Sequence, residues 1–307
     1  MNFADRDGFI WMDGAFTPWR DAKIHVLTHT LHYGMGAYEG IRAYETNQGT
    51  SIFRLHDHIA RLFSSAKIFN MPMPYEPAIL AAACVEILQK NNLSAAYIRP
   101  VIFYGSEGMG LRATNLKTHV AIAAWSWGEY LGDGSLENGI RIKTSSYVRN
   151  YINSLPVKAK GNGHYVNSML ALQEALACGY DEALMLDHQG FVAEGSGENF
   201  FMIKKGIIYT PPLACILDGI TRDTVCQLVA DMGLSLVEKN ITRDEVYLAD
   251  EAFFTGTAAE VTPIRELDGR VIGSGKRGEI TTKIQALFFD QVYARRKEHP
   301  EWLTFVK

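Results

Sequence analysis

Apolar residues recur at helical spacing in the first third of the chain. Leu55, Ile59 and Leu62 lie three or four positions apart, and the pattern continues to Ala66. A second apolar stripe follows Pro77, a residue type that suits the first turn of a helix. Because residues three and four apart share one face of a helix, the two stripes predict two amphipathic helices.

Strand patterns follow these helices. The segments 97–104 and 119–127 are rich in β-branched and aromatic residues and predict adjacent strands. A polar stretch with several glycines comes next, over 128–137, and is the best candidate for a linker between domains. The predicted organisation is therefore a small N-terminal domain over 1–127, this linker, and a larger domain over 138–307.

The second half mixes strands, helices and hairpins. Strands are predicted at 140–147, 182–186 and 199–203, and a helix at 166–177. Lys204, Lys205 and Gly206 predict a hairpin turn into a strand at 207–210, and Gly233 follows the apolar stripe of a later helix as a C-cap. Frequent hairpins favour an α+β fold in two layers over a parallel doubly wound sheet.

Composition narrows the class of protein. The chain has 307 residues, of which 47% are hydrophobic and 21% charged, as in an ordinary globular protein of one or two domains. Its 30 basic and 34 acidic residues give a formal net charge of −4, which argues against nucleic acid and anionic membranes as partners. Asp5, Arg6 and Asp7 do not fit a signal peptide, and no apolar run reaches the roughly 18 residues of a membrane helix.

Four cysteines, at positions 84, 178, 215 and 226, are scattered and form no CxxC pair. Such spacing predicts reduced thiols rather than a disulfide framework or a zinc site. Together with the N-terminus, it favours a cytoplasmic protein.

Two motifs carry weaker signals. Gly273–Gly278 matches GxGxxG between a short strand and a helix, but no second strand of a βαβ unit follows, so a flexible surface loop is favoured. His25, His29 and His32, and likewise His56 and His58, could suggest metal ligands. Because no HExxH motif is present, structural or hydrogen-bonding histidines are the favoured interpretation.

Four further stretches combine polar, charged and small residues: Val157–Tyr165, Glu194–Phe201, Leu217–Asp223 and Phe254–Glu260. The third leads into a helix, whose free N–H groups form an anion site. The fourth offers hydroxyl groups and close backbone approach. Two such loops can cradle one phosphate, although for either loop alone a simple helix cap or turn is the favoured interpretation.

Two charged residues in these stretches have demanding surroundings. Glu198 precedes Phe200 and Phe201, and a carboxylate among apolar neighbours needs a partner such as a cationic ring nitrogen. Lys160 stands between Ala159 and Gly161, which allow a bulky group to approach its amine. The alternative for Lys160 is an ordinary solvated surface charge.

These stretches resemble those of the class IV pyridoxal-phosphate aminotransferases, which have fold type IV. The signature runs from Glu194 through Ile208–Thr210 to Leu217–Arg222. Four more stretches are similar to the branched-chain amino-acid aminotransferase subgroup: His32–Gly34, Glu39–Arg42, Tyr97–Pro100 and Trp127–Gly132. The resemblance covers nearly the whole chain. It implies a smaller N-terminal α/β domain and a larger C-terminal domain with a mixed, barrel-like sheet.

The resemblance implies pyridoxal 5′-phosphate as cofactor and no metal. Lys160 would hold it as a Schiff base through its ε-amine and later move a proton. Glu198 would keep the pyridine nitrogen protonated, and Tyr165 would hydrogen-bond the phenolic oxygen. The phosphate would bind Arg61, the N–H groups of Ile220 and Thr221, and Thr257, with Leu217 and Gly219 also at the cofactor.

The resemblance also implies a pocket for two kinds of substrate. Tyr97 and the N–H groups of Thr257 and Ala258 would bind the α-carboxylate, and Arg99 would supply charge for glutamate. Gly40 would leave room for the side chain. The apolar wall, partly reaching across a dimer interface, would consist of Tyr33, Tyr38, Leu111, Trp127 and Tyr130. At Tyr38 many relatives carry phenylalanine, so its hydroxyl changes the polarity of the pocket.

The expected reaction exchanges the amino group between leucine, isoleucine or valine and 2-oxoglutarate, giving branched-chain 2-oxo acids and glutamate. A pocket shared between chains implies a homodimer or a larger homo-oligomer, such as a hexamer. The alternatives are a D-amino-acid aminotransferase, an aminodeoxychorismate lyase, or a non-catalytic binding protein of the same fold. Tyr97–Pro100 and Trp127–Gly132 disfavour the first two, and the presence of Lys160 and Glu198 disfavours the third.

Overall fold

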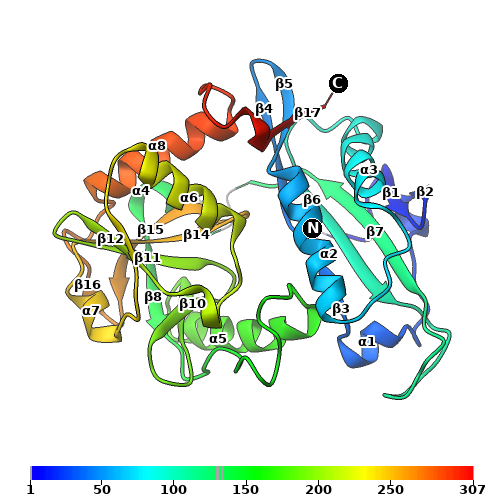
Figure 1. The fold of residues 1–307 in the computed structure, drawn as a ribbon, viewed down its shortest axis with the longest axis horizontal. Coiled ribbons are helices and arrows are strands. Elements are labelled where there is room, and N and C mark those ends of the chain that lie inside the picture. The colour runs from blue at the N-terminus through cyan, green and yellow to red at the C-terminus, as the bar shows by residue number, and fades with distance from the viewer. Residues whose placement is uncertain (1, 129–130, 133, 307) are drawn as a thin grey trace. The chain divides into compact units, whose positions relative to one another are not determined.

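The chain forms two compact units, each with a sheet of its own (Figure 1). The computed structural model describes residues 2–128, 131–132 and 134–306. Unit 1 comprises Met1–Trp127, Ala159–Gly163 and Val292–Lys307, and unit 2 comprises Gly128–Lys158 and His164–Gln291.

The division after residue 127 coincides with the predicted one, but the rest of the predicted boundary needs correction. The C-terminal strand β17 (Leu303–Phe305) pairs antiparallel with β5 (Gly49–Phe53), so the chain end belongs to unit 1 rather than to one domain over 138–307. Gly161 likewise forms a bridge with Ala37 of unit 1. In the predicted linker 128–137, helix α4 (Ser135–Asn138) begins within unit 2, and 129, 130 and 133 lie outside the described residues.

Unit 1 is built on an eight-stranded sheet in the order β17-β5-β4-β6-β7-β1-β2, with β3 paired to β6. The strand pairs among its described residues are antiparallel. The predicted strands over 97–104 and 119–127 are β6 and β7, and they are neighbours as expected. Besides β5 and β17, this unit contains β1 (Phe9–Met12), β2 (Ala15–Pro18), α1 (His29–Tyr33), β3 (Gly36–Tyr38), β4 (Ile41–Thr46), α2 (Leu55–Ile68), α3 (Pro77–Lys90), β6 (Ala96–Tyr104) and β7 (Thr118–Trp125).

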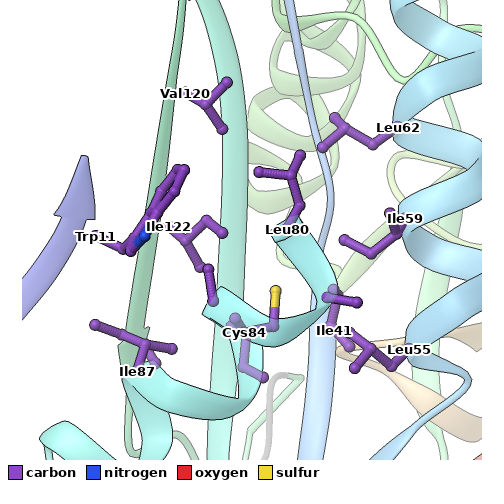
Figure 2. Close-up of a cluster of buried hydrophobic side chains, with 14 of the residues drawn as sticks. Trp11, Ile41, Leu55, Ile59, Leu62, Leu80, Cys84, Ile87, Val120 and Ile122 are labelled. Carbon is purple, nitrogen blue, oxygen red and sulfur yellow. The ribbon is translucent and has the colours of Figure 1, made fainter. Parts of the chain in front are cut away.

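The core of unit 1 lies between this sheet and the two predicted helices. Leu55, Ile59 and Leu62 of α2 are at most 2% exposed and point toward the same cluster as Leu80 and Ile87 of α3 (Figure 2). Pro77 occupies the first turn of α3, as predicted. Burying these apolar faces against the sheet provides the main driving force for folding this unit. It also fixes α2, which carries several residues of the site described below.

Unit 2 is built on a mixed nine-stranded sheet that closes on itself. Its path runs β10-β9-β8-β15-β14-β11-β12-β13, and an additional pairing of β10 with β11 closes the first six strands into a ring. The expected barrel-like sheet is therefore confirmed. The strands are β8 (Ile140–Thr144), β9 (Glu182–Leu186), β10 (Val192–Gly195), β11 (Asn199–Lys204), β12 (Ile207–Thr210), β13 (Leu236–Glu238), β14 (Glu251–Gly256), β15 (Glu260–Leu267) and β16 (Arg270–Val271).

Both faces of the barrel wall are buried. Phe200 pairs with Phe254 and Phe201 with Phe253 across β11 and β14, and all four are fully buried. Successive side chains of a strand point to opposite faces, so these rings fill the interior and the outer layer alike. The helices of this unit are α4, α5 (Tyr165–Ala177), α6 (Ile220–Asp231), α7 (Arg243–Tyr247) and α8 (Glu279–Val292).

Local signals in unit 2 are confirmed. Lys205 and Gly206 have φ angles of 51° and 76°, which suits the tight turn of the predicted hairpin between β11 and β12. Gly233, with φ of 67°, donates to Ala230 O just beyond α6, so it ends that helix as predicted. Within the described residues, no helix is both long and apolar enough to cross a membrane.

Candidate active site

Residues of unit 1 form hydrogen bonds with both the backbone N–H and the backbone carbonyl of Lys160. Its N–H donates to Ser65 Oγ on α2 at 3.0 Å, and its carbonyl accepts the N–H of Tyr38 at 3.1 Å. Gly161 bridges to Ala37 next to it. The half-buried Lys160 side chain therefore starts from a fixed point rather than from a flexible surface loop.

Aromatic and cationic side chains surround this amine within unit 1. Lys160 Nζ lies 5.3 Å from the centroid of the Tyr38 ring, and Arg99 Cζ lies 4.3 Å from the same centroid. Arg99 Nη2 donates to the Tyr97 hydroxyl at 3.2 Å, and the ring of Trp127 is 4.6 Å from that of Tyr97. Predicted residues from β3 and β6 thus form one cluster with Trp127.

Gly40 allows this cluster to pack closely. A β-carbon at position 40 would stand 1.9 Å from the Tyr97 hydroxyl oxygen. Tyr97 is 6% exposed and packs against Trp125 and Trp127, so its ring has little freedom to move away. Glycine at this position is therefore a steric requirement.

A buried ion pair lies beside the Lys160 loop in unit 1. Glu39 follows β3 and is fully buried, and its carboxylate accepts hydrogen bonds from Arg61 Nε at 2.7 Å and Nη2 at 2.8 Å. His58 Nδ1 lies 2.7 Å from the same carboxylate. Burial alone would raise the pKa of Glu39, but Arg61 and His58 hold it far below its usual range.

In unit 2, Glu198 lies in the turn that closes the barrel. The turn joins β10 to β11, whose residues Glu194 and Asn199 are paired. Glu198 is only 3% exposed, and Gly197 N–H donates to its Oε2 at 3.0 Å. A β-carbon at Gly195 would approach that oxygen to 2.7 Å, so glycine leaves room there for the carboxylate.

The same turn contacts two other predicted stretches of unit 2. A β-carbon at Gly256 would lie 3.6 Å from Glu198 Cγ, so the end of β14 borders the Glu198 side chain. Asn199 Nδ2 donates to Leu217 O at 3.1 Å, just before α6. Three of the four stretches singled out in the sequence therefore meet in unit 2.

The start of α6 offers unshielded N–H groups. The helix has 12 residues, its N-cap is Gly219, and no side chain caps it. A β-carbon at Gly219 would lie 1.8 Å from Asn199 Oδ1, so only glycine permits this approach. A helix start without a side-chain cap is suited to bind an anion such as phosphate.

Buried polar contacts brace the turn and the approach to α6. Glu194 accepts hydrogen bonds from Arg149 Nε at 2.5 Å, Asn199 Nδ2 at 3.2 Å and the Leu217 N–H at 3.3 Å. Lys158 forms an ion pair with Asp218 and donates to the carbonyl of Ile216. These contacts fix where the turn of Glu198 lies relative to the start of α6.

A comparison with known families decides the class of protein. A family model described as amino-transferase class IV matches residues 36–267, most of the chain. The chain belongs to the class IV aminotransferases. A curated branched-chain-amino-acid aminotransferase of Pseudomonas aeruginosa is 61% identical over 307 residues and covers both chains completely. One of Escherichia coli strain K12 is 43% identical over 97% of each chain.

Solved structures of relatives share the fold of this class IV aminotransferase along nearly its whole length. The crystal structure of the Escherichia coli branched-chain amino acid aminotransferase has a TM-score of 0.96 at 42% identity, and the match covers 98% of this chain and 100% of that one. The branched-chain amino acid aminotransferase from Thermobaculum terrenum, solved in its PLP-form, has a TM-score of 0.91 at 33% identity, covering 98% and 99%. The fold type IV expectation is thereby confirmed.

Some predicted residues of the class IV aminotransferase lie apart from these clusters. Tyr33 is 43% exposed and packs on His29, and Leu111 is 89% exposed. Their expected reach across a dimer interface stays a prediction. Tyr130 lies outside the described residues. Tyr165 ends the lysine stretch and is the first residue of α5, and Thr257 and Ala258 are half-buried in the loop after β14.

The GxGxxG motif of the class IV aminotransferase lies in a surface loop, as predicted, with Gly273, Ser274 and Lys276 exposed. A β-carbon at Gly273 would lie 1.9 Å from Asp250 O, and one at Gly278 would lie 2.0 Å from Glu251 Cδ. The Glu251 carboxylate accepts the N–H groups of Ile280 and Thr281, so it already fills the anion position at the start of α8.

His25, His29, His32 and His58 make hydrogen bonds, as favoured. His29 Nε2 contacts Gly110 O at 3.1 Å, His32 Nε2 contacts Val26 O at 2.8 Å, and His58 contacts Glu39. Among the described residues, no group of three or more His, Cys, Asp or Glu side chains is placed to hold a metal ion.

Sequence reasoning missed the roles of Glu39, His58, Ser65 and Glu194 in this class IV aminotransferase. One signal was available on α2, where His58, Arg61 and Ser65 follow the spacing of one helix face. The partner of that face, Glu39, comes from a different strand and could be found only from the fold.

Proposed function

We propose that this class IV aminotransferase transfers the amino group between branched-chain L-amino acids and 2-oxoglutarate with pyridoxal 5′-phosphate. The observation that carries the proposal is the amine of Lys160, presented from a backbone that is clamped on both sides. The full-length identity of 61% to a protein named for this activity supports the choice of substrate.

The residues present suit the chemistry of the cofactor. Its phosphate needs cationic and N–H donors, which Arg61, Thr257 and the uncapped start of α6 at Ile220 and Thr221 supply. Its pyridine nitrogen needs an acidic partner, and we assign this role to the carboxyl group of the buried Glu198. In the same proposal Leu217 and Gly219 line the phosphate end, and Tyr165 donates to the phenolic oxygen.

Lys160 and Glu198 share the chemical work in this proposal. When bound, the cofactor supplies an electron sink that accepts the electrons of the substrate Cα–H bond. Lys160 Nζ holds the cofactor at rest and then takes the proton from Cα. Glu198, as an ionised carboxylate shielded from water, favours the protonated pyridine nitrogen.

The cluster around Tyr97 suits selection between two substrates. The Tyr97 hydroxyl and the N–H groups of Thr257 and Ala258 would bind the α-carboxylate. Arg99 lies against both Tyr38 and Tyr97, and would attract the γ-carboxylate of glutamate. Branched side chains would contact the aromatic wall, for which we propose Tyr33, Tyr38, Leu111, Trp127 and Tyr130.

Replacing Gly40 by alanine should damage substrate binding. The added methyl group would displace the Tyr97 hydroxyl, and we expect the KM for leucine to rise about tenfold because such misplacement is costly. Overpacking should also lower the free energy of unfolding by about 1–3 kcal/mol. Steady-state kinetics and thermal unfolding measure both effects.

Gly128→Ala is the matched control, since nothing in the described part of the chain lies within 4 Å of a β-carbon there. An unchanged KM in Gly40→Ala would contradict the proposed place of Tyr97 in the substrate site.

A substrate profile tests the proposed activity. Leucine, isoleucine and valine should each yield glutamate from 2-oxoglutarate, whereas D-alanine and 4-amino-4-deoxychorismate should not react. Activity confined to D-alanine or to 4-amino-4-deoxychorismate would replace the proposal with a different fold type IV reaction. A purified protein without visible absorbance that cannot take up the cofactor would favour a binding protein.

Assembly and compartment belong to the same proposal. We expect a homodimer or a larger homo-oligomer, because the proposed pocket includes the highly exposed Leu111, which a second copy would cover. We also expect the protein in the cytoplasm. Analytical ultracentrifugation measures the assembly, and cell fractionation measures the compartment. A monomer with full activity would contradict a pocket shared between chains.

A further inference from the structure

We propose that Glu39 is a positioning residue, whose buried carboxylate fixes the guanidinium plane of Arg61 for the phosphate of the cofactor. The inference rests on the proposed function, in which Arg61 binds that phosphate. It goes beyond that function by assigning a role to a side chain that touches neither substrate nor cofactor.

The contact between the two side chains is two-pronged. Arg61 Nε donates to Glu39 Oε1 at 2.7 Å, and Arg61 Nη2 donates to Glu39 Oε2 at 2.8 Å. Two parallel hydrogen bonds fix the rotation of a planar guanidinium as well as its position. A single hydrogen bond, or a purely electrostatic contact, would leave that rotation free.

His58 holds the carboxylate from its other side. Its Nδ1 lies 2.7 Å from Glu39 Oε2, and both side chains are almost fully buried. Burial lowers the pKa of His58, and the positive charges of Arg61 and Lys160 lower it further, against the opposite effect of Glu39. A neutral His58 then donates one hydrogen bond to Glu39 without competing with Arg61 for its charge.

The ion pair is poorly explained by stability alone. Glu39 is fully buried between Ala37 and Ile41, which belong to the apolar core of unit 1. Removing two charges from water costs free energy that their attraction often fails to recover, so apolar residues of similar volume commonly serve a core as well or better. The geometry that Glu39 imposes on Arg61 accounts for its place.

Ser65 connects this pair to the reactive lysine. Its hydroxyl accepts the Lys160 N–H at 3.0 Å and donates to the Arg61 carbonyl at 3.0 Å, one turn earlier on α2. The Lys160 backbone also accepts from Tyr38, the residue before Glu39. The backbones of Arg61 and Lys160 are thus both hydrogen-bonded to Ser65. The two hydrogen bonds to Glu39 then fix the guanidinium group of Arg61.

The test compares binding of pyridoxal 5′-phosphate with binding of pyridoxal, which lacks the phosphate, to the full-length chain stripped of cofactor. In Glu39→Gln the two-pronged contact is lost while the volume is kept. We expect the Kd for pyridoxal 5′-phosphate to rise roughly ten- to a hundredfold, as for a lost hydrogen bond to a charged group, and the Kd for pyridoxal to change by less than about threefold.

Two further variants keep the test decisive. Glu39→Asp retains the charge but is too short for both bonds, so it should show the same phosphate-selective loss. In an Arg61→Lys background, Glu39→Gln should add less than about threefold, because it acts through Arg61. Glu45→Gln, at an exposed carboxylate of β4, is the control and should bind both ligands normally.

The proposal would be overturned if Glu39→Gln and Glu39→Asp lost affinity equally for both ligands. It would also be overturned if these variants bound pyridoxal 5′-phosphate as tightly as the unaltered chain, or more tightly. A full additional loss in the Arg61→Lys background would overturn it as well. A failure of the proposed function is distinguishable, because then the unaltered chain itself would not discriminate between the two ligands.

Discussion

Replacing Lys160 by alanine should lower kcat for the transamination of leucine by about 10³-fold or more, because proton transfer by a positioned side chain alone contributes roughly 10²–10⁴-fold. The methyl side chain of alanine also lacks the ε-amine that we propose as the point of covalent attachment of the cofactor. The variant should keep its fold, since the clamp on position 160 uses backbone atoms that alanine retains. Single-turnover kinetics with leucine, followed by absorbance, measures the loss.

Lys67→Ala provides the control, because it removes the same charge from an exposed position of α2. It should retain the activity of the unaltered chain. Substantial leucine turnover in Lys160→Ala, within about tenfold of that chain, would place the proton transfer on another residue.

Glu198→Gln should reduce kcat by about 10²-fold, the usual scale for losing one electrostatic contact to a developing charge. The amide preserves the shape of the side chain but carries no charge to favour a protonated pyridine nitrogen. Glu198 is buried in the turn between β10 and β11, where its carboxylate accepts the Gly197 N–H. The visible absorbance of the bound cofactor should shift together with kcat.

Glu279→Gln, at an exposed carboxylate on α8, should leave both readouts unchanged. A Glu198→Gln variant with an unaltered spectrum and kcat within about twofold would show that the ring nitrogen does not depend on this residue.

Local patterns in the sequence predicted the elements of each unit well. The stripes around Leu62 and Leu80 became α2 and α3, because their apolar spacing matches a helix face. The turn at Lys205 and Gly206 was predictable because a two-residue hairpin demands positive φ there. The predicted strand over 140–147 ends earlier, at Thr144, where Ser145 and Ser146 instead hydrogen-bond the Glu174 carboxylate.

Pairings between distant segments could not be predicted from these patterns. Strand β17 joins β5 across about 250 positions of sequence, and nothing local to Leu303–Phe305 encodes that partner. The same holds for Gly161 and Ala37, whose bridge assigns the lysine loop to unit 1. Hydrophobic periodicity reports which face of an element is buried, but not which element covers it.

The candidate site shows the same contrast. The stretches around Glu198, Gly219 and Gly256 were found in the sequence, and they meet in unit 2 because β11 borders both β14 and the approach to α6. Glu39 belongs to a stretch that resembles the branched-chain subgroup, but a lone glutamate next to a glycine carries no local signal of its own role. Its role emerged from contacts with His58 and Arg61, which lie on a different element.

The central claim, that Lys160 carries the cofactor, is tested most directly by trapping the linkage. The chain loaded with pyridoxal 5′-phosphate is reduced with borohydride, digested and mapped by mass spectrometry. Our account predicts one phosphopyridoxyl group, on Lys160. A label on Lys158, two positions earlier and paired with Asp218, or on any other lysine in its place, would contradict the account.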